Sequence, residues 1–112
     1  MPLINIRTGK TGHGVDLDGF ACELSEKTGI DAKRINIIVD YFEKPDFRSG
    51  QGTDKSIVHI WLSETNEKES IQGLARTVAG LTEKYFQIED GSTAVICNLV
   101  REGCMFVNNK FK

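Results

Sequence analysis

The chain has 112 residues, of which 39% are hydrophobic and 27% are charged, so it has the composition of one ordinary globular domain rather than of a disordered chain. Its 14 basic and 16 acidic side chains nearly cancel and leave a formal net charge of −2. Because nucleic-acid binding requires a strongly positive surface, we expect no nucleic-acid partner.

The three cysteines, Cys22, Cys97 and Cys104, have no C-x-x-C spacing, and neither histidine lies near them in the sequence. We therefore expect no metal site and no disulfide framework, and we interpret all three as buried, reduced thiols. No apolar run approaches the ~18 residues that a membrane span needs, and the N-terminal residues do not form the apolar core of a signal peptide. The sequence thus predicts a soluble cytoplasmic domain without membrane contact.

The first half of the chain predicts a strand, a helix and a second strand. Residues 3–7 are a short strand, which the glycine-rich loop TGKTGHG follows; because this loop lacks the complete nucleotide-binding pattern, we expect no cofactor. Apolar residues then recur at helical spacing over residues 17–28, with Asp16 as the expected N-cap and Gly29 as the residue that ends the helix. Residues 34–42, RINIIVDYF, are rich in isoleucine and valine and predict the second strand.

The second half repeats this order. Residues 56–63, SIVHIWLS, predict a strand, and Asn66 with Glu69 resembles a capping box at the start of a helix. An apolar stripe over residues 71–85 predicts the helix itself, and residues 91–100 predict the last long strand.

The resulting order is β-α-β, loop, β-α-β. Since crossover connections are right-handed, each half should form a parallel strand pair, with both helices on one face of the sheet. Gly73 and Gly80 on the second helix indicate close packing of that helix against the sheet. We expect a single domain over residues 1–112 that consists of two pseudo-repeats and a tail: residues 2–43, 56–100 and 101–112.

The predicted strands are apolar on both faces. In residues 34–42 one face carries Ile37 and Val39, while the other still carries Ile38 and Phe42. Strands of this kind belong to sheets that are covered on both faces. Two helices on one side can cover only one face, so the pattern predicts an oligomer.

Pro2 is the residue whose position suggests chemistry. Removal of Met1 leaves a proline with a free secondary amine at the start of a strand. An ordinary α-amine has a pKa of about 7.7–8.0, and an apolar pocket or a nearby positive charge lowers that pKa. The neutral amine can then act as a general base near neutral pH, so we interpret Pro2 as the candidate catalytic residue.

A chain that begins M-P-L-I-N-I and consists of two β-α-β halves resembles the tautomerase superfamily. This superfamily includes the 4-oxalocrotonate tautomerases (4-OT), with one β-α-β unit per chain, and the macrophage migration inhibitory factor type, with two. The resemblance covers essentially the whole chain and rests on five pieces: Pro2, Gly19-Phe20, Thr28-Gly29, the FRSGQG loop of residues 47–52 and the Asn-Asn-containing tail of residues 107–111.

The resemblance implies an α+β fold of order β-α-β-β-α-β. In this fold a four-stranded mixed sheet carries two helices on one face, and its other face is buried in a homotrimer with a site around each N-terminal proline. It also implies a keto–enol tautomerase or isomerase of small 2-oxo or unsaturated carboxylic acids.

The chain departs from the family pattern at the expected carboxylate-binding positions. Ile30 stands where the inhibitory-factor type has a lysine, and Asn36 stands where the 4-OT type has an arginine. Arg34, two residues earlier on the predicted strand, is therefore our candidate for binding the substrate carboxylate, whereas Lys33 should point the other way. We expect four residues to contact substrate beside Pro2: Arg34, Asn36, Ser63 and Phe106.

A second function stays open at this point. The alternative to the enzyme is a non-catalytic oligomeric binding module, of tautomerase-like or ferredoxin-like fold, in which Pro2 has no chemical role. His59 is interpreted as a core or interface histidine and Trp61 as a packing residue. Whether Met1 is removed distinguishes the two functions, because only its removal frees the Pro2 amine.

Overall fold

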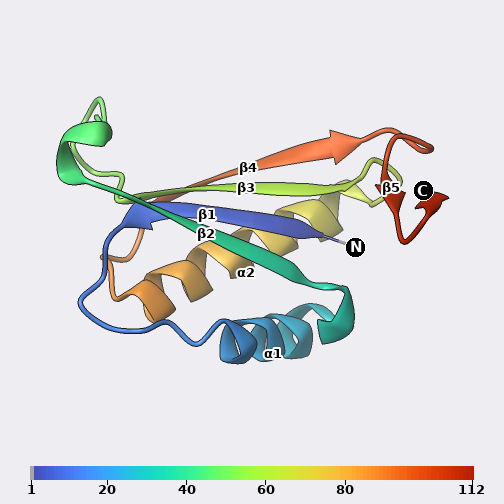
Figure 1. The fold of residues 1–112 in the computed structure, drawn as a ribbon, viewed down its shortest axis with the longest axis horizontal. Helices are drawn as coiled ribbons and strands as arrows, with labels where there is room; N and C mark the ends of the chain where they lie inside the picture. Colours follow the sequence, from blue (N-terminus) through green and yellow to red (C-terminus); the bar gives the residue numbers. More distant parts are fainter. Residues whose placement is uncertain (1) are drawn as a thin grey trace.

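The computed structural model describes residues 2–112, and the expected removal of Met1 therefore lies outside the described residues. Two β-α-β units share one mixed sheet of four strands in the order β2-β1-β3-β4 (Figure 1). Two strand pairs are parallel, β1 (Leu3–Gly9) with β2 (Asn36–Phe42), and β3 (Ser56–Ser63) with β4 (Thr93–Val100). The antiparallel pairing of β1 with β3 joins the two units. The predicted α+β fold and its β-α-β-β-α-β order are confirmed.

The first helix, α1 (Leu17–Thr28), has both of its predicted caps. The Asp16 carboxylate accepts a hydrogen bond from the backbone N–H of Gly19 at 2.9 Å, and this bond satisfies one free donor of the first turn. Gly29 ends the helix in the left-handed conformation, with φ of 78°, which glycine adopts without a steric penalty.

The second helix, α2 (Lys68–Phe86), differs from the prediction in two respects. Its expected capping box is wrong, because the Asn66 amide instead donates to the Ser63 carbonyl at 2.8 Å and closes the turn that follows β3. Close packing at Gly73 and Gly80 is also wrong: a Cβ placed on either glycine would meet no neighbouring element of residues 2–112 within 4 Å. The structure shows no packing reason for glycine at these positions.

Both helices lie on the same face of the sheet (Figure 1), and the core fills the space between them and the strands. The alternate residues of the two central strands point into this space, and each buried aliphatic side chain contributes roughly 1.5–3 kcal/mol. The largest fully buried apolar side chains are Ile4, Ile6, Phe20, Leu24, Val58, Ile60, Val78 and Leu81.

The predicted start of the second strand at residue 34 is wrong, because the segment before β2 is helical rather than extended. Residues 32–34 form the short 3-10 helix η1 (Ala32–Arg34), because the Asp31 carboxylate accepts a hydrogen bond from the backbone N–H of Lys33 at 3.0 Å. Arg34 therefore lies before β2 and not on it. Strand alternation does not set the direction of its side chain.

The face of the sheet away from the helices, the open face, is uncovered in the subunit. Ile38 is 53% exposed there and Ile96 is 48% exposed, and Trp61 is half-buried on the same face. His59 stacks on Trp61 with ring centroids 5.5 Å apart, and its Nδ1 lies 3.3 Å from the Asn98 amide. His59 is therefore a half-buried histidine of this face rather than of the helix-covered core.

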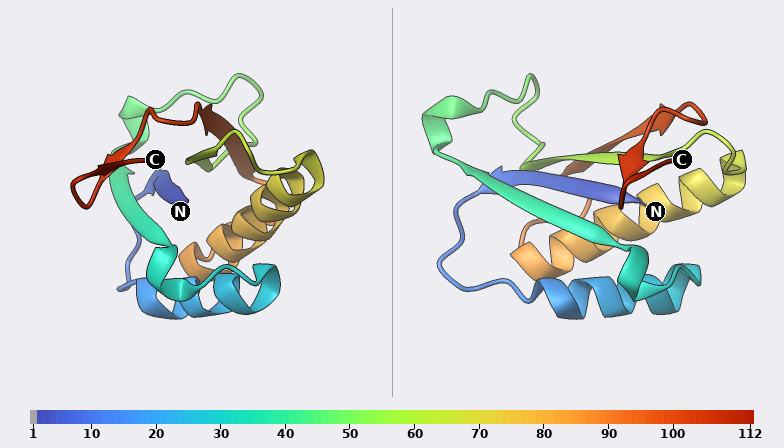
Figure 2. Two further views of the ribbon diagram at one scale, coloured as in Figure 1. Left: turned by 90° about the vertical axis from the view of Figure 1, so that its right-hand side faces the viewer. Right: turned by 45° about the vertical axis from the view of Figure 1, so that its right-hand side comes forward.

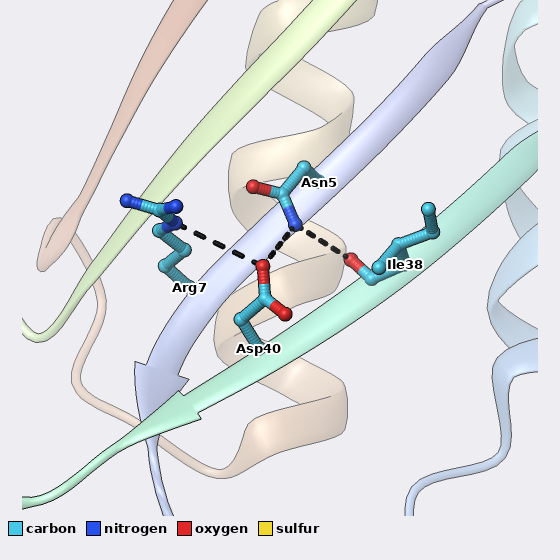
Figure 3. A network of polar contacts seen from close by, with 4 residues as sticks. All are labelled: Asn5, Arg7, Ile38 and Asp40. Atoms are coloured by element: carbon cyan, nitrogen blue, oxygen red, sulfur yellow. Dashed lines mark hydrogen bonds and ion pairs between the residues drawn. The ribbon is translucent and has the colours of Figure 1, made fainter.

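A polar network crosses the same open face (Figure 3). The Asn5 amide donates to the Asp40 carboxylate at 2.9 Å and to the Ile38 carbonyl at 3.3 Å. The Arg7 guanidinium lies 3.8 Å from the same carboxylate. Side chains from β1 and β2 thus hold one another in place between the exposed apolar residues.

The chain ends in a hairpin of β5 (Phe106–Val107) and β6 (Lys110–Phe111), which lies at the end of the sheet where β1 begins (Figures 1 and 2). Asn108 and Asn109 form its turn with positive φ angles of 53° and 63°, which asparagine tolerates in tight hairpin turns.

The predicted burial of the cysteines is wrong for two of the three. Cys22 and Cys104 are exposed, on the outer surface of α1 and in the turn before β5, respectively. Cys97 is partly buried against the core, and this burial raises the pKa of its thiol. No helix within residues 2–112 is long and apolar enough to cross a membrane.

Candidate functional site

Pro2 lies directly before β1 and is buried in the subunit. Its carbonyl oxygen accepts a hydrogen bond from the backbone N–H of Asn36 at 3.2 Å, so the β1–β2 ladder extends to it. Proline fits this position because the first residue of a strand does not need to donate to the ladder. The hydrogen bond to β2 thus holds Pro2 in a fixed place at the start of the central strand β1.

Pro2 forms part of the wall of a cavity of about 400 Å³. In Figure 2 the start of β1 lies between η1 and the N-terminal end of α2, and residues of these elements complete the wall. The apolar part of the lining is Pro2, Ile30, Leu62 and Leu74, and its polar part is Thr28, Asp31, Arg34, Asn66 and Ser70.

Hydrogen bonds at the end of α1 fix the corner that carries Arg34. The Thr28 hydroxyl donates to the Leu24 carbonyl at 2.7 Å and accepts from the backbone N–H of Ile30 at 3.3 Å. The Asp31 side chain then caps η1, and the backbone N–H of Arg34 donates to the Asp31 carbonyl at 2.8 Å. The backbone therefore places Arg34 at the cavity without using its side chain.

The Arg34 guanidinium is exposed and forms no ion pair with any side chain of residues 2–112. Guanidinium binds carboxylates with two parallel hydrogen bonds when its fork is free. Pro2 at the start of β1 and a cation with an unused fork therefore border the same cavity. This arrangement suits a small ligand that carries a carboxylate.

The other three predicted substrate contacts do not line this cavity in the described subunit. Asn36 points to the open face, with its side-chain amide 3.4 Å from the Arg34 carbonyl. The Ser63 hydroxyl lies 2.8 Å from that of Thr65 in the turn after β3. Phe106 is 60% exposed and packs on Phe111, with ring centroids 4.9 Å apart.

Sequence reasoning missed three polar side chains of the lining: Asp31, Asn66 and Ser70. Asn66 lies in the turn before α2 and Ser70 lies in the first turn of that helix. No helical spacing links the two in the sequence, and the expected capping role of Asn66 gives no hint of a cavity. Asp31 carried the signal of a capping residue just after the glycine that ends α1.

Comparison with known proteins identifies the fold. No protein-family model matches the chain, and no curated protein matches it in sequence. The F6 fused 4-OT wild type asymmetric trimer superposes with a TM-score of 0.82 at 11% identity, over 97% of this chain and 94% of that one.

Two further solved structures agree. Macrophage migration inhibitory factor from Oncomelania hupensis gives a TM-score of 0.76 at 9% identity, over 99% of this chain and 82% of that one. Pt0534 inactivated by 2-oxo-3-pentynoate gives a TM-score of 0.71 at 7% identity, over 95% of this chain and 92% of that one. The chain therefore has the tautomerase fold, as the resemblance of its sequence predicted.

Proposed function

We propose that the protein is a keto–enol tautomerase or isomerase of small 2-oxo or unsaturated carboxylic acids, with the free amine of Pro2 as general base. The observation that carries this proposal is the presence of Pro2 and Arg34 in the wall of one cavity of about 400 Å³. A protein of the same fold, Pt0534, was inactivated by 2-oxo-3-pentynoate, a small 2-oxo acid, which supports this substrate class.

In the proposed reaction the neutral Pro2 nitrogen takes a proton from the carbon beside the substrate carbonyl. The electron pair of that C–H bond moves toward the carbonyl oxygen, giving an enolate and a prolinium ion. The prolinium then returns the proton to the oxygen, giving the enol, or to a more distant carbon, giving an isomerised acid. Arg34 holds the carboxylate in the direction that presents this carbon to Pro2, and its positive charge favours the enolate.

The site we propose is shared between subunits of a homotrimer. The exposed Ile38 and Ile96 give the open face apolar surface that a second copy would cover. Several solved structures of this fold are described as trimers, which supports the same assembly here. In such an assembly Asn36, Ser63 and Phe106 would complete a pocket in another copy, since they lie outside the cavity of their own subunit.

The test compares a chain that begins at Pro2 with the same chain carrying one extra alanine before Pro2, each verified by intact mass. The extra residue turns the Pro2 nitrogen into an amide, which cannot accept a proton near neutral pH. With phenylenolpyruvate as substrate, kcat/KM for its conversion to the keto acid should fall by about 10²–10⁴-fold, the usual contribution of a positioned general base. Circular dichroism and sedimentation should be unchanged.

Two further measurements refine this test. Pro2→Ala keeps an N-terminal amine and should retain partial activity. For the chain that begins at Pro2, kcat/KM should rise with pH as the amine loses its proton, with an apparent pKa below the ordinary range of about 7.7–8.0. Equal activity with the extra alanine would place the base elsewhere, and a chain beginning at Pro2 that is inactive on a panel of 2-oxo acids would support the binding module.

A further inference from the structure

A second and larger cavity, of about 790 Å³, lies at the end of the sheet opposite to Pro2. Its walls come from the glycine-rich loop after β1, from the long connection between β2 and β3, and from the C-terminal end of α2. In Figure 1 these three segments lie at the same end of the molecule, where β1 and β2 terminate. The proposed proton transfer makes no use of this cavity.

This cavity occupies the position in the second β-α-β unit that the Pro2 cavity occupies in the first. α1 ends in Gly29, with φ of 78°, and α2 ends in Gln87, with φ of 56°, so both helices close in the left-handed conformation. Isoleucine follows in each case, as Ile30 and Ile88. Each of these pairs lines the cavity at its own end of the sheet, so the two cavities are equivalent corners of a repeated unit.

The two corners differ in their chemistry. Where β1 is preceded by Pro2, β3 begins with Ser56, which is fully buried. The Ser56 hydroxyl donates to the Thr93 hydroxyl at 3.1 Å, so it is engaged within the sheet. The second corner therefore has no counterpart of Pro2, and we consider it as a site for binding a ligand rather than for the proton transfer proposed at the first corner.

The apolar part of the lining is aromatic. Phe42 and Phe47 pack together with ring centroids 4.9 Å apart, and Phe86 at the end of α2 is also part of the wall. Aromatic side chains pack favourably on a further ring in tilted or offset arrangements. The cavity can thus take a flat aromatic group.

The charged part of the lining is positive on balance. Lys10 is paired with Glu43, so these two charges cancel locally. Lys44 and Lys55 also line the cavity, and neither forms an ion pair within residues 2–112; Asp54 is the remaining carboxylate of the wall. The lining therefore carries one net positive charge next to aromatic rings.

We propose that this cavity is a second, non-catalytic binding site for a small aromatic carboxylate. The ring of the ligand packs against the half-buried Phe42 and Phe47, and its carboxylate faces Lys44 and Lys55. The inference does not depend on the proposed function, because it requires neither a free Pro2 amine nor any turnover.

The test is a titration of isotope-labelled protein with phenylacetate, followed by ¹H–¹⁵N correlation spectra. It uses the chain with the extra alanine before Pro2, in which the proposed catalytic amine is blocked. We expect the amide signals of the glycine-rich loop, of Phe47 and of Gln87 and Ile88 to shift in a saturable manner. 2-Phenylethylammonium has the same ring and the opposite charge, and it should bind several-fold more weakly.

Charge-removing variants then test the position of the carboxylate. Lys44→Ala and Lys55→Ala should each weaken phenylacetate binding by about two- to fivefold, the usual worth of an exposed ionic contact, and added salt should weaken binding in the parent chain. Lys27→Ala removes the same charge from α1, outside the cavity, and should change nothing. Unshifted signals at this corner, equal binding of the cation, or equal affinity in the lysine variants would overturn the proposal.

Discussion

Replacing Arg34 by alanine should weaken turnover at the Pro2 cavity without unfolding the protein. The Arg34 side chain lines the cavity and forms no ion pair in residues 2–112, so alanine leaves no buried charge without a partner. The bond that closes η1 uses the backbone N–H of Arg34, which alanine retains. The local fold should therefore survive the substitution.

The magnitude follows from the contact that is lost. A hydrogen bond to a charged group contributes about 1.5–3 kcal/mol, and the larger values belong to contacts withdrawn from water. Arg34 is exposed in the subunit, so the lower part of this range, about 1.5–2 kcal/mol, applies. Since about 1.4 kcal/mol corresponds to a factor of ten, kcat/KM should fall about 10- to 30-fold.

The assay is the conversion of phenylenolpyruvate to its keto form, with Lys33→Ala as the matched control. Lys33 is the neighbouring exposed cation of η1 and does not line the cavity, so its loss should change kcat/KM less than twofold. Arg34→Lys retains the positive charge but lacks the forked guanidinium, so its kcat/KM should lie between those of Lys33→Ala and Arg34→Ala. Equal losses from Lys33→Ala and Arg34→Ala, or no loss from Arg34→Ala, would remove Arg34 from the proposed site.

Three further predictions concern stability and assembly. Gly80→Ala should raise the free energy of unfolding in urea by up to about 1 kcal/mol, because the added methyl meets open space and alanine is the better helix former; a loss of stability would contradict the packing described for α2. Hydrogen bonds from Lys84 and Tyr85 lower the pKa of Glu23, and the Glu23 bond raises the pKa of Tyr85 to about 12. The contribution of Tyr85 to the free energy of unfolding is therefore complete below pH ~10 and is lost as the pH rises toward 12. The contribution of Glu23 is present above the ordinary glutamate pKa of about 4.3 and is lost as the pH falls below it. In a plot of melting temperature against pH, Glu23→Gln should reduce both the loss of stability in acid and the loss above pH ~10. An unchanged profile would show that the contacts of Glu23 with Lys84 and Tyr85 have no net effect on stability. Deletion of residues 104–112 should shift sedimentation toward smaller species if the tail hairpin contacts a neighbouring copy, whereas an unchanged mass would exclude that contact.

Most of the fold was predictable because its signals are local and mutually consistent. Asp16 and Gly29 carried the standard chemistry of helix ends, and both act as predicted. The handedness of crossover connections then required both helices to lie on one face of the sheet. The start of β2 was not predictable from strand propensity, because the Asp31 carboxylate captures a backbone N–H and turns the chain into η1 before the strand begins.

The candidate site was less predictable than the fold. Pro2 and Arg34 line one cavity because the corner after α1 returns the chain to the start of β1, and both residues stood out in the sequence by their chemistry. Asn36, Ser63 and Phe106 were expected beside them, but the sheet and the tail direct them elsewhere in the subunit. The residue pattern of a single sequence does not show which surfaces of two copies meet, so it does not predict contacts between subunits.

The network of Asn5, Arg7 and Asp40 has a consequence for any surface that covers the open face (Figure 3). When a partner removes water from this face, the charged pair is left in a medium of low dielectric constant. There, each hydrogen bond that the carboxylate or the guanidinium fails to make costs free energy of binding. A covering surface must therefore present polar atoms at this place as well as apolar atoms opposite Ile38 and Ile96. The network therefore contributes little to the affinity of an interface, but it contributes to specificity, because a purely apolar surface or a misaligned copy would leave its polar groups without partners.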